Sequence, residues 1–203
     1  MSGRTVDARR AVQYMKMAWY APLIVARWCT TSAPVVDADV DRWSGIVRPD
    51  RGPMPLLWLL ARYPEFRTLY YYRLRRGNLA GRAFAAIAAV VYHGERTLHL
   101  ASSEIGPGLF IQHGFATIVA ASRVGANCWI NQQVTIGFDR PDARPVLGDN
   151  VSVHAGAKVL GAVAIGDGAR IGANAVVLHD VPAGCTAVGV PARILPPKSH
   201  RPS

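Results

Sequence analysis

Residues 159–177 have the sequence VLGAVAIGDGARIGANAVV, in which an aliphatic residue returns every six positions. Neither a helix, with 3.6 residues per turn, nor a strand, whose side chains alternate every two residues, produces this period. A chain that turns a corner every six residues does produce it. Three short strands then form one triangular coil of about 18 residues, and such short repeats predict a solenoid.

The same period extends outward from this segment over most of the C-terminal half. The aliphatic residues that we place inside the coils are Ile105, Ile111, Ile118, Val124, Ile130, Ile136, Leu147, Val153, Val159, Ile165, Ile171 and Val177. Small or modest side chains follow four positions after most of them, at Val134, Val151, Ala157, Val163, Ala169 and Ala175. The period breaks near Thr117, by one residue, and again before Leu147, where the segment FDRPDARPV bulges outward. Binding groups are often placed on such loops of a rigid scaffold.

Stacking the coils produces a candidate site. Repeats that begin at 111, 130, 153 and 171 lie on one side, and their third residues form a column of His113, Gln132, Ala155 and Ala173. Successive coils lie about 4.8 Å apart, so the column makes a strip roughly 14 Å long. A neutral imidazole can take a proton from a hydroxyl near pH 7, and the alanines leave room for a long, thin ligand. His113 is therefore the candidate general base, although a surface histidine without a catalytic role is the alternative.

The N-terminal half is expected to be helical. In chain order we expect a polar, mobile start at 1–12, a helix at 13–31, a linker or irregular segment at 32–54, a helical hairpin at 55–76 bent near Pro64, and a helix at 79–93. The predicted domains are an α-helical N-terminal domain at 1–97, a β-helix at 98–195 and a tail at 196–203. The fold class is thus mainly β, preceded by a small helical domain.

Charge is concentrated in the first half of the chain. Residues 1–103 contain 15 basic and 7 acidic side chains, a net charge of +8. We interpret this as a solvated arginine-rich surface, with an anionic substrate or an acidic membrane as alternatives. No recognition motif accompanies the charge, so we expect no nucleic-acid partner. The apolar run at 83–92 is too short to span a bilayer, and we favour a buried helix there over contact with a membrane surface.

Cysteine usage indicates a reducing compartment. Cys29, Cys128 and Cys185 lie far apart and form no CxxC pair, which favours a cytoplasmic protein without structural zinc. Cys128 occupies a small-residue position of its repeat, so we expect it to fill the core. We predict no metal site.

Four segments carry a family resemblance. IGPGLFIQHGFATIV at 105–119, QQVTIG at 132–137, AGAKVLGAVAIGDGARIGANAVVLHDVP at 155–182 and VGVPARIL at 188–195 resemble the serine acetyltransferase-like branch of the hexapeptide-repeat acyltransferases. The resemblance implies a left-handed parallel β-helix and a homotrimer, with acetyl-CoA as co-substrate in the groove between subunits and no tightly bound cofactor. In serine acetyltransferase the helical domain pairs two trimers, and whether this shorter version does so stays open.

The resemblance also implies roles for single residues. The family's general base matches His113, and the alanines that line its pantetheine groove match Ala155 and Ala173. The family's basic residue in the following coil matches Arg170, which could pair with a phosphate of CoA. Gly137 matches a glycine whose N–H could stabilise an oxyanion near the thioester.

The acceptor side departs from the family pattern. Two acids of the family fall on Leu98 and Gln112, a second histidine falls on Arg144, and the loop around Arg144 is three residues shorter. In the family these groups bind the amine and carboxylate of serine and orient the base. Residues that could contact a different acceptor are Gln132, Arg144 and His154, and those that could replace the missing acids are His99, His154, Glu104 and Asp50.

The sequence therefore predicts an acetyl-CoA-dependent O-acetyltransferase acting on a sugar, a glycan precursor or another hydroxylated small molecule. No Ser or Cys nucleophile lies in the column, which favours direct attack of the acceptor on the thioester. The alternatives are L-serine O-acetylation in cysteine biosynthesis and a non-catalytic β-helix assembly protein. A zinc hydratase built on this fold needs three histidine ligands, two of them five residues apart, and no two histidines here have that spacing.

Overall fold

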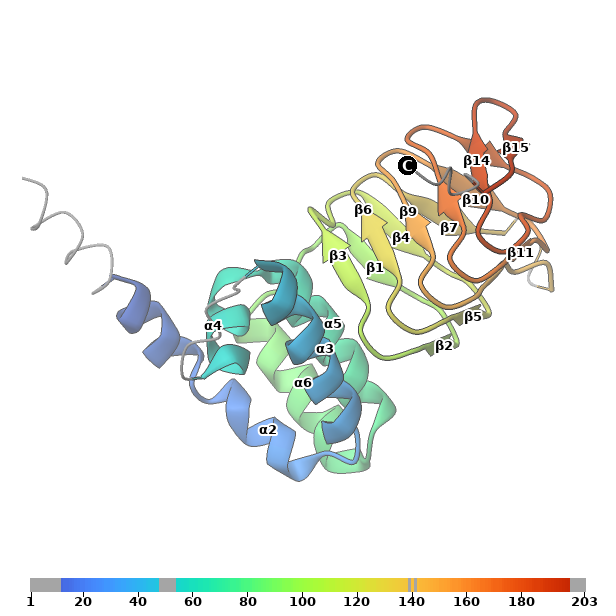
Figure 1. Ribbon diagram of the computed structural model, residues 1–203. Helices are drawn as coiled ribbons and strands as arrows, with labels where there is room; N and C mark the ends of the chain where they lie inside the picture. The colour runs from blue at the N-terminus through green and yellow to red at the C-terminus, as the bar shows by residue number, and fades with distance from the viewer. Residues whose placement is uncertain (1–11, 48–53, 139, 141, 198–203) are drawn as a thin grey trace, which may run out of the picture. The chain divides into compact units, whose positions relative to one another are not determined.

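A computed structural model describes residues 12–47, 54–138, 140 and 142–197 (Figure 1). The chain divides into two compact units, Met1–Glu95 and Arg96–Ser203. The first unit is helical and the second is a β-solenoid. The predicted mobile start lies outside the described residues except for Val12, and so do residues 198–203 of the predicted tail.

In its described residues, the helical unit contains five bounded helices after a first helical stretch at 12–20. They are α2 (Leu23–Cys29), α3 (Ala33–Val47), α4 (Pro55–Arg62), α5 (Pro64–Arg76) and α6 (Leu79–Val91). The predicted hairpin is present, and its bend lies at Tyr63, which has the extended backbone (φ −117°, ψ 107°) that a following proline imposes. Among the described residues, no helix is long and apolar enough to cross a membrane.

The prediction of a linker at 32–54 was wrong for its larger part. Helix α3 buries Val36, Val40 and Trp43, which recur at the spacing of one helical face. Asp39 on the same helix is also buried, because the Arg73 Nε donates to its Oδ2 at 2.8 Å. Proline, glycine and aspartate suggested a loop, but Pro34 lies in the first turn, where proline is tolerated. Residues 48–53 lie outside the described part of the chain.

Helix α6 forms where the sequence predicted it, but it is only partly buried. The Asn78 side chain caps its first turn by accepting a hydrogen bond from the Gly81 N–H at 3.0 Å. Its buried residues are Gly81, Ala85 and Ala88, whereas Ile87 and Val90 face solvent. The expectation of a buried helix at 83–92 is therefore corrected to a helix with one exposed apolar side.

The second unit is a parallel β-helix whose strands form three sheets (Figure 1). The first sheet contains β1 (Leu98–Leu100), β4 (Thr117–Val119), β7 (Thr135–Gly137), β10 (Lys158–Leu160) and β13 (Val176–Val177). The second contains β2 (Glu104–Ile105), β5 (Arg123–Val124), β8 (Val146–Leu147) and β11 (Ala164–Ile165). The third contains β3 (Phe110–Gln112), β6 (Trp129–Asn131), β9 (Ser152–Val153), β12 (Arg170–Ile171), β14 (Thr186–Val188) and β15 (Arg193–Leu195). The predicted fold class is confirmed, and the last pair, β14 and β15, is antiparallel.

The interior of the β-helix is the predicted aliphatic column, with one correction. Ile118 is 42% exposed, whereas Val119 is fully buried and pairs with Ile136 of the next coil. The corner before β4 is longer than the repeat predicts, with left-handed backbone at His113 (φ 53°) and Ala116 (φ 51°). The extra length moves the interior position from 118 to 119. Cys128 fills the core as predicted, and burial raises the pKa of its thiol to about 11.

Candidate active site

The register of the third sheet brings the predicted column together. Ile111 pairs with Ile130, Ile130 with Val153, and Val153 with Ile171. The residues two positions later therefore occupy equivalent places in successive coils, and these residues are His113, Gln132, Ala155 and Ala173. Backbone hydrogen bonds continue the stacking past the strands, from Gly156 N to Gln132 O at 3.0 Å and from Asn174 N to Ala155 O at 2.9 Å.

His113 lies at the head of this column on a tight, exposed corner. Its carbonyl accepts a hydrogen bond from the Phe115 N–H at 2.8 Å, and its left-handed φ of 53° is unusual for a residue with a side chain. The following turn is held by Thr97, whose Oγ1 accepts from the Ala116 N–H at 2.8 Å. Similar φ values at Ala116, Asn127, Gln133, Asn150 and Asn174 show that this backbone conformation recurs in the turns of the β-helix. The imidazole is exposed, so an acceptor hydroxyl could reach it.

Two amide side chains next to His113 form a hydrogen bond that the sequence analysis missed. The Asn131 Nδ2 donates to the Gln112 Oε1 at 3.1 Å across adjacent coils. Within the described residues, Asn131 Oδ1 and the neighbouring Gln132 Oε1 are buried and accept no hydrogen bond. A buried acceptor without a donor is costly, so both oxygens could accept from N–H or O–H groups of a ligand. The predicted register already placed Gln112 and Asn131 opposite each other on adjacent coils, and this pairing could have predicted the hydrogen bond.

The far end of the column is open and has only small side chains. Ala155 is half-buried and Ala173 is exposed, so neither methyl group fills the strip beside the coils. Arg170 lies on the same coil as Ala173, three residues earlier, and its side chain is exposed. Strand β12 holds it in register between Ser152 and Thr186. A phosphate that followed the column could therefore be met by a guanidinium on its last coil.

Gly137 and Arg144 lie at a different corner. Gly137 ends β7, and the bulged segment begins immediately after it. The Arg144 guanidinium lies 4.1 Å from the centroid of the Phe138 ring, and its carbonyl accepts from the Ser122 Oγ at 3.3 Å. Within one copy of the chain, the width of a three-residue strand, about 10 Å, separates this corner from that of His113. Within one copy, these candidate residues therefore lie in two separate groups rather than in a single cluster.

Among the described residues, no candidate replacement for the missing acids pairs with His113. Neither position of the family's acids supplies a carboxylate, because residue 98 is a leucine and residue 112 is a glutamine. Leu98 is buried, and the Gln112 side chain is hydrogen-bonded to Asn131. Glu104 lies on the second sheet, 3.8 Å from the Arg123 Nε. Asp50 lies outside the described residues.

The two remaining histidine candidates lie on other coils or another sheet. His99 is exposed on the first sheet, opposite Ile118. His154 is exposed two coils beyond Gln112, a separation of about 10 Å. No three His, Cys, Asp or Glu side chains of the described segments gather where they could hold a metal ion.

Comparison with known proteins identifies the family. The model of the bacterial transferase hexapeptide, six repeats, matches residues 144–179. The serine acetyltransferase of Helicobacter pylori J99 is 40% identical over 147 residues, which cover 68% of this chain and 84% of that protein. The serine acetyltransferase of Synechococcus elongatus is 38% identical over 147 residues, which cover 60% of its length.

Solved structures agree. The crystal structure of Neisseria gonorrhoeae serine acetyltransferase in complex with serine superposes with a TM-score of 0.62 at 28% identity, over 81% of this chain and 69% of that one. Soybean serine acetyltransferase complexed with serine superposes with a TM-score of 0.57 at 30% identity, over 81% and 70% of the two chains. Sequence, fold and relatives together place this chain in the serine acetyltransferase-like branch of the hexapeptide-repeat acyltransferases, and it is an acetyltransferase.

Proposed function

We propose that this chain transfers the acetyl group of acetyl-CoA to the hydroxyl of L-serine, with His113 as the general base. The similarity to serine acetyltransferases, at 40% identity over 84% of the Helicobacter pylori protein, carries the proposal. The two superposed structures described as serine complexes support the same acceptor. Although the residues of the acceptor side alone favour a sugar, the comparisons favour serine, and membership of an enzyme family disfavours a non-catalytic scaffold.

The proposed reaction is a direct displacement in a ternary complex. An imidazole nitrogen of His113 takes the proton of the hydroxyl, and the oxygen forms a bond to the thioester carbonyl carbon. The tetrahedral intermediate then collapses, the carbon–sulfur bond breaks, and the CoA thiolate takes the proton from the imidazolium. The strip along Gln132, Ala155 and Ala173 is the proposed path of the pantetheine arm, and Arg170 is the proposed contact for a phosphate.

The proposed site is completed by a neighbouring copy. Within one copy the corner of Gly137 and Arg144 lies away from His113, so these groups would act on the site of an adjacent subunit in a homotrimer. There the Gly137 N–H would stabilise the oxyanion, and Arg144 or His154 would contact the acceptor. Mixing an inactive His113→Ala chain with an inactive Arg144→Ala chain tests this arrangement, because mixed trimers regain some sites in which both groups are intact. Activity that does not recover on mixing would contradict it.

The function is tested by following the free thiol released from acetyl-CoA in the presence of L-serine. We expect turnover with L-serine, and a loss of about 10²- to 10⁴-fold in kcat for His113→Ala, the range usual for a general base. His93→Ala, a histidine of the helical unit, is the matched control and should retain activity. Equal turnover by the His113→Ala and wild-type proteins would remove the proposed mechanism.

A second acceptor class, the hydroxyl of a sugar or glycan precursor, is favoured by one observation. Position 98 is a buried leucine and Gln112 offers an amide, so neither presents a carboxylate to an ammonium group. Because the Gln112 Oε1 already accepts from Asn131, its Nε2 would face a ligand as a donor, which suits a hydroxyl oxygen better than an amine. Comparing L-serine with a panel of sugars in the same thiol assay decides between the two. Gln112→Asp should raise kcat/KM for L-serine only if serine is the acceptor.

A further inference from the structure

Helix α6 has an apolar face that no described residue of the helical unit covers. Leu79, Ala83, Ile87 and Val90 recur at the spacing of one helical face and are exposed. Ile87 and Val90 are each 72% exposed, and Leu79 is 78% exposed. The helix is about 20 Å long at 1.5 Å per residue, so this stripe runs along most of its length. A continuous exposed apolar patch of this kind usually marks an interaction surface.

Helix α2 widens the patch. It packs against α6 and exposes Val25 and Trp28, the latter by 76%. Trp19 precedes α2 and lies 5.7 Å from the ring of Tyr92, the residue that follows α6, whereas Thr30 follows α2 and lies beside Gly81 in the first turn of α6. The two helices are therefore antiparallel, with one exposed tryptophan at each end of α6. We call the α2–α6 face the surface formed by Trp19, Val25, Trp28, Leu79, Ala83, Ile87 and Val90.

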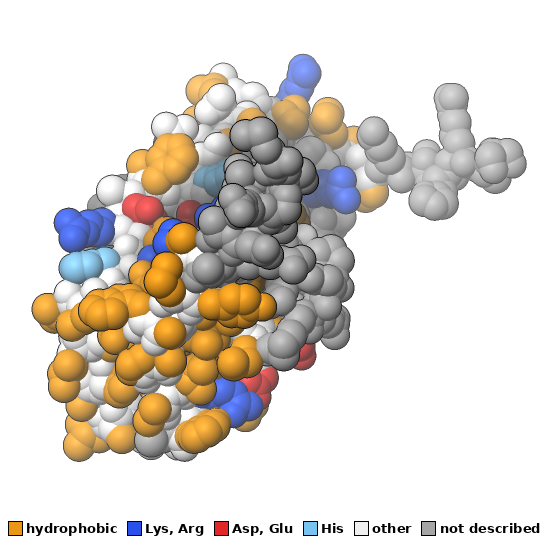
Figure 2. All heavy atoms as spheres, turned by 90° about the vertical axis from the view of Figure 1, so that its left-hand side faces the viewer, with side chains coloured by type: hydrophobic (Ala, Val, Ile, Leu, Met, Phe, Trp, Pro, Cys, Tyr) orange, Lys and Arg blue, Asp and Glu red, His pale blue; other side chains and the backbone are white. Residues whose placement is uncertain are grey.

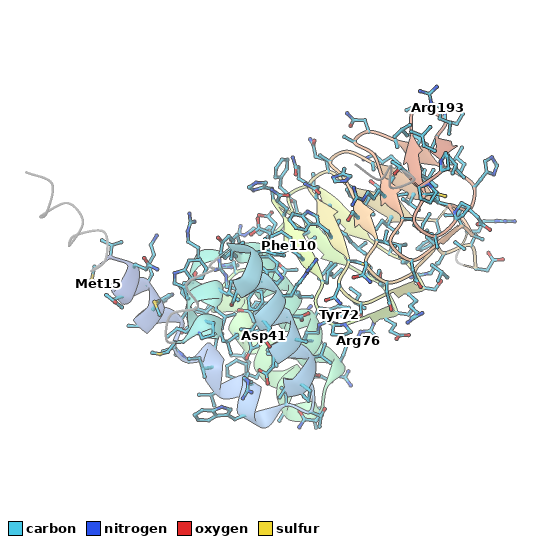
Figure 3. All side chains as sticks on the ribbon, in the orientation of Figure 1. Met15, Asp41, Tyr72, Arg76, Phe110 and Arg193 are labelled. Atoms are coloured by element: carbon cyan, nitrogen blue, oxygen red, sulfur yellow. The ribbon has the colours of Figure 1, made fainter. Side chains whose placement is uncertain are left out.

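Figure 2 shows hydrophobic side chains gathered over part of one face, with Lys and Arg as well as Asp and Glu side chains at the margin. Neither α2 nor α6 contains an acidic residue. Arg82 is exposed within α6, and Arg75 and Arg76 are exposed at the end of α5, next to the first turn of α6. Figure 3 labels Arg76 and Tyr72, whose ring lies 4.9 Å from the Arg76 guanidinium carbon. The face thus combines an apolar surface with a basic end.

We propose that the α2–α6 face rests on the surface of an anionic lipid bilayer. Tryptophan is enriched at membrane interfaces, and an amphipathic helix with arginine at its polar margin binds there by burying its apolar side. Residues 1–95 contain 14 basic and 7 acidic side chains, a net charge of +7, and anionic headgroups would complement that charge. A second copy of the chain is the competing occupant, but its α2 and α6 would bring no carboxylate to meet the arginines.

The test is co-sedimentation of the full chain with phosphatidylcholine vesicles, with and without phosphatidylglycerol. We expect binding only to the vesicles that contain phosphatidylglycerol, and weaker binding at high salt. The double variant Ile87→Gln/Val90→Gln should lose roughly tenfold or more in partition coefficient, since two exposed apolar side chains no longer enter the interface. Arg82→Gln should lose roughly fivefold. Arg123→Gln, an exposed arginine of the β-helix unit, is the charge-matched control and should bind like the wild type.

The remaining outcomes contradict the proposal. Equal binding to both kinds of vesicle would show that the arginines do not select anionic lipid. Binding to neither would show that the α2–α6 face does not bind a lipid bilayer. Light scattering tests the competing occupant, a second copy of the chain. If the Ile87→Gln/Val90→Gln variant forms an assembly of lower mass than the wild type, the α2–α6 face is a contact between copies. Thermal unfolding of each variant should stay within a few degrees of the wild type, because these side chains are exposed in the folded chain.

Discussion

The two units of this chain are stabilised in different ways. The core of the β-helix is built from stacked aliphatic side chains such as Ile130, Val153 and Ile171, which are fully buried and repeat from coil to coil. The core of the helical unit contains a buried ion pair, Arg73 with Asp39, and a second buried arginine, Arg67, whose Nε donates to the His93 carbonyl at 2.7 Å. A repeated fold can use one interaction many times, whereas the helical unit adds single buried polar contacts to an apolar core that includes Trp43 and Phe66.

The largest effect is therefore expected from breaking the buried ion pair. Asp39→Ala leaves the Arg73 guanidinium buried without its carboxylate, and we expect a loss of about 3 to 5 kcal/mol in the free energy of unfolding. Urea denaturation followed by circular dichroism measures it. Asp37→Ala breaks the more exposed pair with Arg27 and is the matched control, with an expected loss of about 1 kcal/mol or less.

Asp39→Leu combined with Arg73→Met sharpens the test of the ion pair. Removing both charges should recover most of the loss, because the pair is then replaced by apolar volume. If the double variant is no more stable than Asp39→Ala alone, the unpaired buried guanidinium is not the source of the loss.

Truncating one residue of the aliphatic column should cost somewhat less. Ile130 lies between Ile111 and Val153 in the stacked coils, and Ile130→Ala would open a cavity there at a cost of about 3 kcal/mol. The same change at Ile194, which is partly exposed on β15, should cost about 0.5 kcal/mol or less. Equal losses at the two positions in urea denaturation would show that the column is not the core of this unit.

How well each unit could be predicted from the sequence depends on whether its contacts repeat along the chain or occur once. The six-residue period determines the coils, and hence the alignment of His113 with Ala155 and Ala173, because register repeats along the chain. Helix α3 was missed because its proline, glycine and aspartates suggested a loop, and because Arg73, which pairs with the buried Asp39, lies far away in the sequence. The bond between Gln112 and Asn131 is visible only when side-chain directions are known. A repeat thus predicts positions, whereas unique polar contacts require coordinates.

Alkaline pH should destabilise the β-helix through Cys128. Burial raises the pKa of this thiol to about 11 from an ordinary value of 9.0. Between these values the unfolded chain loses a proton that the folded chain retains, so stability is complete below pH 9 and falls by about 2 to 3 kcal/mol as the pH rises to 11. The tyrosines of the helical unit contribute from about pH 10 upward, because burial raises the pKa values of Tyr70 and Tyr71 above that ordinary value.

Cys128→Ala isolates this contribution. The variant should show a flatter dependence of unfolding free energy on pH between 9 and 11 than the wild type, whatever its stability at neutral pH. An unchanged slope would mean that Cys128 does not control the alkaline limb.

The smallest effect tests the one position where the period misplaced a side chain. The six-residue repeat, with one extra residue near Thr117, puts Ile118 inside the coil, whereas the structure buries Val119 and leaves Ile118 partly exposed. Val119→Ala should therefore lower the free energy of unfolding by about 2 kcal/mol, and Ile118→Ala by about 0.5 kcal/mol or less. Urea denaturation of the two variants measures the difference. A larger loss at Ile118 would show that the period is interrupted by one residue only, as the sequence predicts. The lengthened corner that presents His113 would then have to be redrawn, because its extra residues are what move the interior position to 119.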